Sequence, residues 1–242
     1  MSEWFEEVKA EFITNFIDGE RWRFLADGLL NTLQITVVAC LIGIAIGIVV
    51  AAVRSSWDKN HETMRPGIGR FFLGFANAIC KVYLTVIRGT PVVVQLMIIY
   101  YIIFASSRNA LGIAMLAFGI NSGAYVAEIV RGGIMSIDVG QFEAGRSLGF
   151  NYVQTMRYVV VPQVFKNVLP TLANEFISLL KETSVAGYVA IQDLTKGGDI
   201  IRGATYSPFM PLIAVAIVYL VMVMFFTWLV GKLERRLRSS ER

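Results

Sequence analysis

The sequence predicts an all-helical integral membrane protein. Of its 242 residues, 55% are hydrophobic and 17% are charged, and its mean hydropathy is +0.60, whereas a typical soluble domain carries about 25% charged residues. Two long runs, Leu29–Val53 and Ser207–Gly231, contain no charged residue. Each exceeds the roughly 20 helical residues that cross a bilayer. Weaker uncharged runs at 89–107 and 109–127 add further candidate spans.

The distribution of charge predicts five spans. Segment 1–27 has three basic and seven acidic residues, whereas the net charges of segments 54–70, 131–166 and 232–242 are +2, +2 and +3. Lys and Arg favour the cytoplasmic side of a membrane. This alternation places the N-terminus outside and the C-terminus in the cytoplasm. It accounts for the basic charge without nucleic acid as a partner.

The N-terminal segment, residues 1–27, carries apolar residues at helical spacing, among them Trp4 and Phe5. This pattern predicts an interfacial helix on the outer face, with a frayed terminus as the alternative. The first span follows at 28–53. Its Gly43 and Gly47 are four residues apart, a spacing that lets a neighbouring helix approach closely.

The remaining spans are less uniform. Pro91 disfavours helix at Thr90, so we expect a cytoplasmic-side helix, a kink and then the second span, or one bent helix from Phe75. The fourth predicted span contains Glu175. We still expect it to cross the membrane, because a charged residue inside a membrane is tolerated when it faces protein or water. The predicted transmembrane domain covers 28–236, with spans at 28–53, 75–107, 109–130, 166–188 and 207–231, a cytoplasmic loop at 131–165, an outer loop at 190–207 and a cytoplasmic tail at 237–242.

The cytoplasmic loop holds a charged, helix-forming block, Glu143-Ala144-Gly145-Arg146-Ser147-Leu148-Gly149, followed by Val161-Pro162. The block resembles the EAA motif of ABC-importer permeases, with Gly145 and Val161 as departures from the pattern. Glu near the helix start and Gly at its end suit the helix dipole and a glycine cap.

Three more stretches extend the resemblance in the same order along the chain, and it covers about residues 28–236. The chain resembles permease subunits of polar amino-acid uptake ABC transporters, the histidine/glutamine/arginine/opine group. The three stretches are Arg88-Gly89-Thr90-Pro91-Val92-Val93-Val94-Gln95, Ala124-Tyr125-Val126-Ala127-Glu128-Ile129-Val130-Arg131-Gly132-Gly133-Ile134 and Leu180-Lys181-Glu182-Thr183-Ser184.

The resemblance implies the type I importer fold in a bacterial plasma (inner) membrane, with a cytoplasmic coupling helix that docks on a separate ATPase. Glu143 would contact that partner, Ala144 and Gly145 would allow close approach, and Gly149 and Pro162 complete the motif. It also implies a second permease, identical or homologous, an extracellular or periplasmic solute-binding protein, and ATP and Mg²⁺ bound by the ATPase.

No catalytic or metal site is predicted on this chain. It lacks the Gly-x-x-x-x-Gly-Lys-Ser/Thr phosphate cradle, so ATP hydrolysis is expected on another subunit and no cofactor on this one. His61 is the sole histidine and follows no ligand pattern. Cys40 and Cys80 lie in apolar stretches and are expected to be structural.

Five polar residues are candidates for the substrate path. Glu175 could accept an ammonium or guanidinium group, or could pair with Lys181 or Arg88. The other candidates are Asn121, Ser122, Gln95 and Tyr100; the first two could instead form interhelical hydrogen bonds.

Two other functions stay open. One is import of a different solute, such as methionine, a metal or a sulfonate, and the other is a non-transporting sensor or channel subunit.

Overall fold

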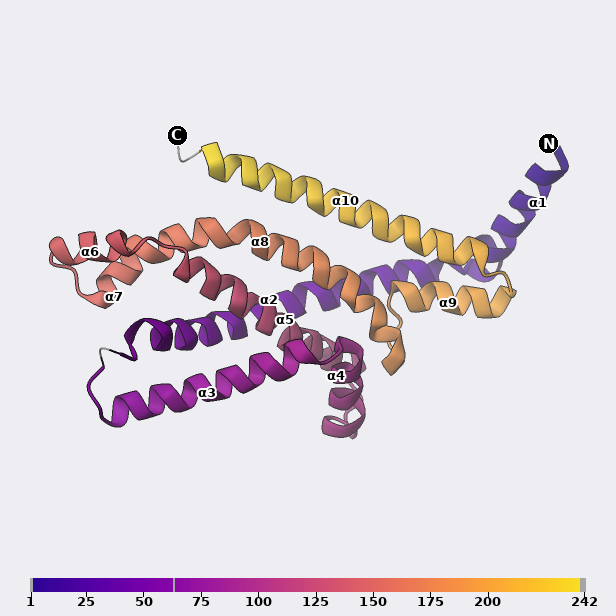
Figure 1. Cartoon of the computed structure of the whole chain (residues 1–242). Coiled ribbons are helices and arrows are strands. Elements are labelled where there is room, and N and C mark those ends of the chain that lie inside the picture. Colours follow the sequence, from indigo (N-terminus) through magenta and orange to yellow (C-terminus); the bar gives the residue numbers. More distant parts are fainter. Residues whose placement is uncertain (1, 63, 240–242) are drawn as a thin grey trace. The chain divides into compact units, whose positions relative to one another are not determined.

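The structure is a computed structural model that describes residues 2–62 and 64–239. These residues form helices and connecting turns without a strand, which confirms the all-helical prediction (Figure 1). The chain divides into two compact units, each described by itself. Unit 1 comprises Met1–Ala39, Val92–Phe118 and Ile177–Trp228, and unit 2 comprises Cys40–Pro91, Gly119–Phe176 and Leu229–Arg242.

Four of the described helices are long and apolar enough to cross a membrane: α2 (Trp22–Asn60), α3 (Ile68–Gly89), α5 (Ala110–Met135) and α10 (Phe209–Ser239). The predicted fourth span falls on α8 (Val161–Glu182), whose composition does not meet the same standard. The count of five spans and their boundaries therefore stay predictions. Several helices extend beyond the predicted limits of the spans; α2, for example, runs from Trp22 to Asn60.

The helical structure is interrupted just before Pro91. α3 ends at Gly89, Thr90 is extended with φ −124° and ψ 148°, and α4 (Val92–Ile98) leads into a π-helical turn, η3 (Ile99–Ile103). Steric pressure from a proline ring on the preceding residue explains the break. A helix, a break and a second helical segment were expected, and the alternative of one bent helix from Phe75 is wrong. The longer helix precedes the proline, so the boundaries of the second span, predicted at 75–107, stay open.

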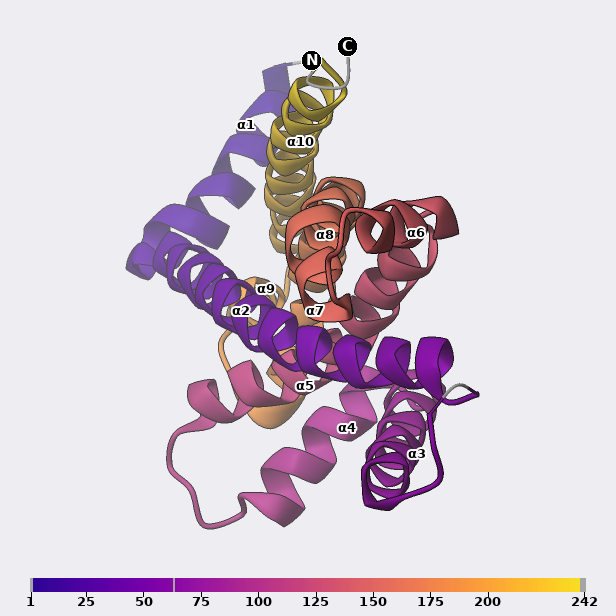
Figure 2. The same cartoon turned by 90° about the vertical axis from the view of Figure 1, so that its left-hand side faces the viewer.

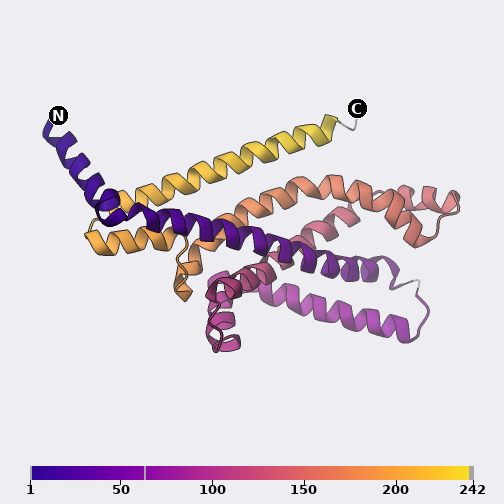
Figure 3. The same ribbon diagram turned by 180° about the vertical axis from the view of Figure 1, so that it is seen from behind.

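Unit 2 is built around close contacts between the second part of α2 and two other helices. α3 runs back beside α2 (Figures 1 and 3), and Arg54 Nη1 donates to Asn77 Oδ1 over 2.8 Å. A Cβ on Gly43 would lie 2.9 Å from Ser122 Oγ of α5, and one on Gly47 would lie 2.5 Å from Val126 Cγ1. The predicted packing role of this glycine pair is confirmed.

Three short elements connect α5 to α8 in unit 2: α6 (Val139–Ser147), α7 (Tyr152–Thr155) and a π-helical turn, η4 (Met156–Val160). Figure 2 shows α6 and α7 flanking the first part of α8. Asn151 and Gln154 form a capping box that starts α7, which satisfies two backbone N–H groups reciprocally.

Unit 1 contains a helix that the sequence analysis missed. Residues 190–207 were predicted as an outer loop, but α9 (Leu194–Thr205) occupies most of them, beside the first part of α2 (Figure 3). Asp193 caps this helix, since its Oδ1 accepts from Lys196 N at 2.7 Å. Leu194 and Ile201 are fully buried, and a Cβ on Gly28 would lie 2.5 Å from the Asp193 carbonyl oxygen.

The N-terminal segment is helical, as predicted. It forms α1 (Ser2–Phe12), a π-helical turn, η1 (Ile13–Ile17), and a short 3₁₀ turn, η2 (Asp18–Glu20). Trp4 and Phe5 are 61% and 64% exposed. This exposure fits an interfacial position, which stays a prediction. Residue 1, and residues 240–242 of the predicted tail, lie outside the described residues.

Candidate functional site

The predicted coupling helix is α6, and both of its ends are closed by local hydrogen bonds. Asp138 Oδ1 accepts from Gly140 N at 2.6 Å at the N-terminus. At the C-terminus, Gly149 has φ +79°, its N–H donates to the Arg146 carbonyl, and the Phe150 N–H donates to the Gly145 carbonyl. This pair of bonds is a Schellman motif, which favours glycine at the left-handed position. The predicted glycine cap is confirmed.

One face of α6 is buried inside unit 2. Phe142 is 8% exposed. Gly145 is also buried, and a Cβ there would lie 2.6 Å from both Cγ2 and Oγ1 of Thr155 in α7. The buried residues that form a cluster with Phe142 are Ile134, Ile137, Val160, Val164 and Val168.

The opposite face of α6 is exposed. Glu143 and Ala144 both lie on it, and Glu143 stands in the middle of the helix rather than near its start. Pro162 is exposed in α8, directly after the π-helical turn η4. Gly145 approaches Thr155 of the same chain closely, whereas its expected close approach to the ATPase stays a prediction.

A lysine that the sequence analysis used only for topology contacts α6. Lys59, near the end of α2, places its Nζ 3.8 Å from the centre of the Phe142 ring. The same ammonium donates to the Ile134 carbonyl oxygen over 3.4 Å. A cation within about 6 Å of an aromatic ring face is attracted to it. No local sequence pattern identifies this contact, because 83 positions separate the two residues.

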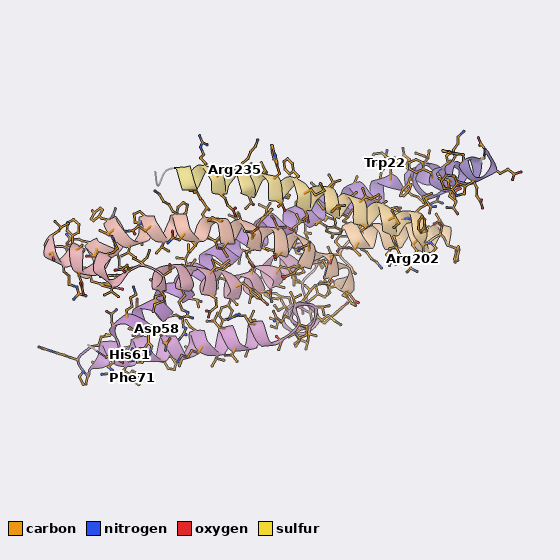
Figure 4. All side chains as sticks on the ribbon, turned by 45° about the horizontal axis from the view of Figure 1, so that its top comes forward. Trp22, Asp58, His61, Phe71, Arg202 and Arg235 are labelled. Atoms are coloured by element: carbon orange, nitrogen blue, oxygen red, sulfur yellow. The ribbon has the colours of Figure 1, made fainter. Side chains whose placement is uncertain are left out.

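An ion-pair chain lies beside Lys59. Asp58 Oδ2 is 3.2 Å from Arg131 Nη1, and Arg131 Nη2 is 3.1 Å from Glu128 Oε2. Glu128 Oε1 is also 3.7 Å from Arg88 Nη1 at the end of α3. Glu128 and Arg131 are three residues apart on α5, a spacing that allows such a pair. Figure 4 labels Asp58, His61 and Phe71 in the region where α2 ends and α3 begins.

Three of the predicted substrate-path residues lie in unit 2. Ser122 Oγ of α5 donates to Glu175 Oε1 of α8 over 3.1 Å. Ser122 is fully buried and the adjacent Asn121 is 2% exposed. The bond supports the interhelical role that the sequence left open for Ser122. Arg88, one of the ion-pair partners considered for Glu175, pairs with Glu128.

The other two substrate-path residues lie in unit 1. Gln95 of α4 is 8% exposed, and Tyr100 of η3 makes an edge-to-face contact with Tyr101 at 4.9 Å between ring centres. The structure thus brings Glu175 and Ser122 together and places Gln95 and Tyr100 in a separate unit.

The family of the chain is identified by its sequence. Residues 67–239 match the family described as "Binding-protein-dependent transport system inner membrane component". The chain belongs to this family. Membership confirms the expectation drawn from the block around Glu143 and its three companion stretches.

The sequence similarity to two known permeases covers nearly the whole length of this chain. The chain is 36% identical over 221 residues to the arginine transport system permease protein ArtQ of Bacillus subtilis (strain 168), covering 90% of this chain and 94% of that protein. It is 35% identical over 220 residues to the glutamine transport system permease protein GlnP of Escherichia coli (strain K12), covering 88% and 93%.

Solved structures of ABC transporters share the fold of this chain. A crystal structure described as an amino acid ABC transporter with histidines is 38% identical, with a TM-score of 0.78, and the match covers 91% of this chain and 98% of that chain. An inward-facing form of the MetNI methionine ABC transporter has a TM-score of 0.71, covers 88% and 96%, and is 19% identical. The second likeness shows the fold alone.

Unit 2 of this inner membrane component also has an apolar groove of about 560 Å³. Its walls come from α2, α5, α7, η4 and α8 and carry Ile44, Val126, Val164 and Phe176 among others. Glu175, Ser122 and Asn121 are not part of its lining. A polar amino acid would lose hydrogen bonds to water there without replacing them.

Asp193 is a buried carboxylate outside the candidate spans. Burial raises its pKa to about 6, against hydrogen bonds from the Lys196 backbone that lower it. Its second oxygen, Oδ2, has no hydrogen-bond partner among the described residues. Burial disfavours the charged form of a carboxyl group, so Asp193 binds its proton more tightly in the folded protein than an exposed Asp does.

The described residues contain no group of three or more His, Cys, Asp or Glu side chains that could hold a metal ion. His61 Nδ1 lies 2.9 Å from the Trp57 carbonyl, and its ring stacks on Trp57. Cys40 and Cys80 are free thiols.

Proposed function

We propose that this chain is a permease subunit of an ABC importer that takes up a polar or cationic amino acid across a bacterial inner membrane. Relatives named as arginine and glutamine permeases, at 36% and 35% identity, support this substrate class. The neighbour at 38% identity, described as an amino acid ABC transporter, supports it as well. The chain would form part of the path and would not itself be an enzyme.

The observation that carries the proposal is the two-faced geometry of α6. Phe142 and Gly145 fix the helix to its own unit, while Glu143 and Ala144 remain exposed. This outer face is suited to dock on a separate ABC ATPase, with Glu143 making charge-assisted hydrogen bonds. ATP and Mg²⁺ would bind to that subunit, and closure of its nucleotide sites would move α6.

The complete importer would contain further partners. A second permease, identical or homologous, would complete the path, and a solute-binding protein would deliver the amino acid from outside. The acidic segment 1–27 would lie outside and the basic segment 232–242 in the cytoplasm, in accord with the positive-inside rule.

Glu175 is the residue best suited to recognise a positive charge. It lies within α8 and shares a hydrogen bond with Ser122. Intramembrane carboxylates are costly and commonly belong to a transport path. We propose that Glu175, with Asn121 and Ser122 of the same unit, contributes to the path of the substrate. Gln95 and Tyr100 stay separate candidates for that path.

The alternatives have weaker support. The methionine transporter shares only 19% identity with this chain, so it gives no argument for methionine or for another solute such as a metal or a sulfonate. A sensor or channel subunit would not need an exposed coupling helix. Co-purification with a P-loop ATPase would separate an importer from these non-transporting functions.

Reconstitution of the importer tests the proposal. The chain would be purified with its ATPase and reconstituted in liposomes with its solute-binding protein. Uptake of labelled arginine, histidine, glutamine and methionine would then be compared with and without ATP. We expect ATP-dependent accumulation of at least one of the first three in preference to methionine. Absence of a co-purifying ATPase, or equal uptake without ATP, would refute the proposal.

A further inference from the structure

Lys59 connects three elements of unit 2. It belongs to α2, its ammonium lies 3.8 Å from the centre of the Phe142 ring in α6, and it donates to the Ile134 carbonyl of α5 over 3.4 Å. The contact with the ring requires only that the cation stay over the face of the ring. A long, flexible lysine side chain can therefore follow a shift of the ring.

Phe142 is the residue of α6 best placed to transmit force. It is buried in the cluster around Val160 and Val164, whereas its neighbour Glu143 is exposed on the opposite face. A short helix with both ends capped moves as one body, because its backbone hydrogen bonds hold it together. Displacement of the outer face therefore displaces the Phe142 ring beneath Lys59.

The residue before Lys59 adds a second link to α5 and extends the connection to α3. Asp58 pairs with Arg131 at 3.2 Å, and Arg131 pairs with Glu128 at 3.1 Å in the same helix, α5. Glu128 also lies 3.7 Å from Arg88 of α3. A movement of the end of α2 would thus alter ion pairs with both α3 and α5.

We propose that Lys59 is a positioning residue that transmits movement of the coupling helix to the spans, by holding the Phe142 ring against the ends of α2 and α5. The inference rests on the proposed function and names the first link inside this chain. The simpler role for Lys59 is to cover a buried ring, which would contribute to stability alone.

The test measures ATP hydrolysed per amino acid taken up by the reconstituted importer, with arginine and glutamine as probes. Lys59→Met keeps the length of the side chain and removes its charge, and Phe142→Leu keeps an apolar anchor and removes the ring. We expect each change to raise the ratio roughly two- to thirtyfold, the usual range for residues that carry coupling. Lys59→Arg and Phe142→Trp should restore a ratio near that of the wild type.

Two further variants make the outcome specific. The double variant Lys59→Met with Phe142→Leu should match the more severe single variant, because one contact is removed twice. Lys166→Met, at an exposed position of α8, removes the same charge elsewhere in unit 2 and should leave the ratio unchanged. The amount of ATPase that co-purifies with each variant gives the yield of assembled complex.

The refuting results are distinct. A role in stability alone would lower assembly and uptake together and leave the ratio unchanged. If the double variant raised the ratio by the product of the two single-variant effects, Lys59 and Phe142 would act separately, and the inference would be refuted. A wild-type complex that accumulates neither amino acid refutes the proposed function and this inference with it. A working wild type whose Lys59→Met variant keeps the normal ratio refutes this inference alone.

Discussion

Substitution of Gly145 by alanine sets two physical effects against each other. Gly145 stands inside α6, where glycine is less favourable than alanine by about 1 kcal/mol. On helix propensity alone, the substitution would stabilise the coupling helix. In the structure, however, the new Cβ would lie 2.6 Å from both Cγ2 and Oγ1 of Thr155. Packed carbon atoms stay about 3.5 Å or more apart.

The steric effect should be larger. Thr155 is 1% exposed, and its Oγ1 donates to the Asn151 carbonyl over 3.1 Å. Rotation of Thr155 away from the methyl group would break that bond, which is worth about 1 kcal/mol. Overpacking a well-filled site costs about 1–3 kcal/mol. Because Thr155 is buried and hydrogen-bonded, the upper part of this range, about 2–3 kcal/mol, applies here. After subtraction of the gain in helix propensity, about 1 kcal/mol, we expect Gly145→Ala to destabilise the folded chain by about 1–2 kcal/mol.

Thermal unfolding of the purified chain in detergent measures this effect. A loss of that size lowers Tm by roughly 2–8 °C for a chain of this length. Gly132→Ala in α5 is the matched control, because a Cβ there meets no atom within 4 Å, and it should raise Tm slightly. Adding Thr155→Ala to Gly145→Ala removes both atoms at 2.6 Å and leaves the Cβ of residue 155 at 3.2 Å from the new methyl, so it should recover part of the loss. A Gly145→Ala chain as stable as the wild type would refute the reasoning.

Four further predictions address coupling, substrate, pH and topology. Glu143→Arg should reduce ATP-driven uptake at least about tenfold, since a charge-assisted bond is worth about 1.5–3 kcal/mol; normal uptake in proteoliposomes would contradict a coupling role. Glu175→Gln should weaken uptake of arginine more than that of glutamine, and equal effects would remove Glu175 as a charge partner. The pKa of Asp193 is about 6 in the folded chain, above the ordinary value of 3.8. Between about pH 4 and pH 6 the folded chain therefore binds more protons than the unfolded chain, so its stability should fall as the pH rises through this range. Asp193→Asn should flatten this dependence in unfolding measurements, and an unchanged pH profile would exclude Asp193 as its source. Labels in segments 1–27 and 232–242 should react on opposite sides of the membrane, and labelling on one side would refute an odd number of spans.

Local patterns predicted the features that depend on local interactions. The cap at Gly149 follows from a left-handed backbone position at φ +79°, and the Glu128–Arg131 pair follows from helical spacing. The close approach at Gly43 and Gly47 follows from their four-residue spacing. Each of these needs only residues near in sequence, or the general rule that small residues face other helices.

Features that depend on tertiary contacts were missed or left open. Helix α9 reads as a polar loop because it contains Gly197, Gly198 and Asp199, yet burial of Leu194 and Ile201 makes it a helix. The contact of Lys59 with Phe142 joins distant parts of the chain, and no period in the sequence predicts it. Likewise, hydropathy ranks α8 below the four candidate spans, because charge lowers the score whether it faces lipid or protein.

The arrangement of α6 shows which motif residues pack inside this chain and which are exposed to a partner. Residues three apart on a helix share a face, so Phe142 and Gly145 point inward together, and Glu143 with Ala144 points outward. The family resemblance implied that Gly145 would allow close approach of the ATPase. The helical period places it against Thr155. A change at Gly145 should therefore act first on the stability of α6 in its own unit, whereas a change at Glu143 should act on the complex, and unfolding and uptake measurements can separate the two.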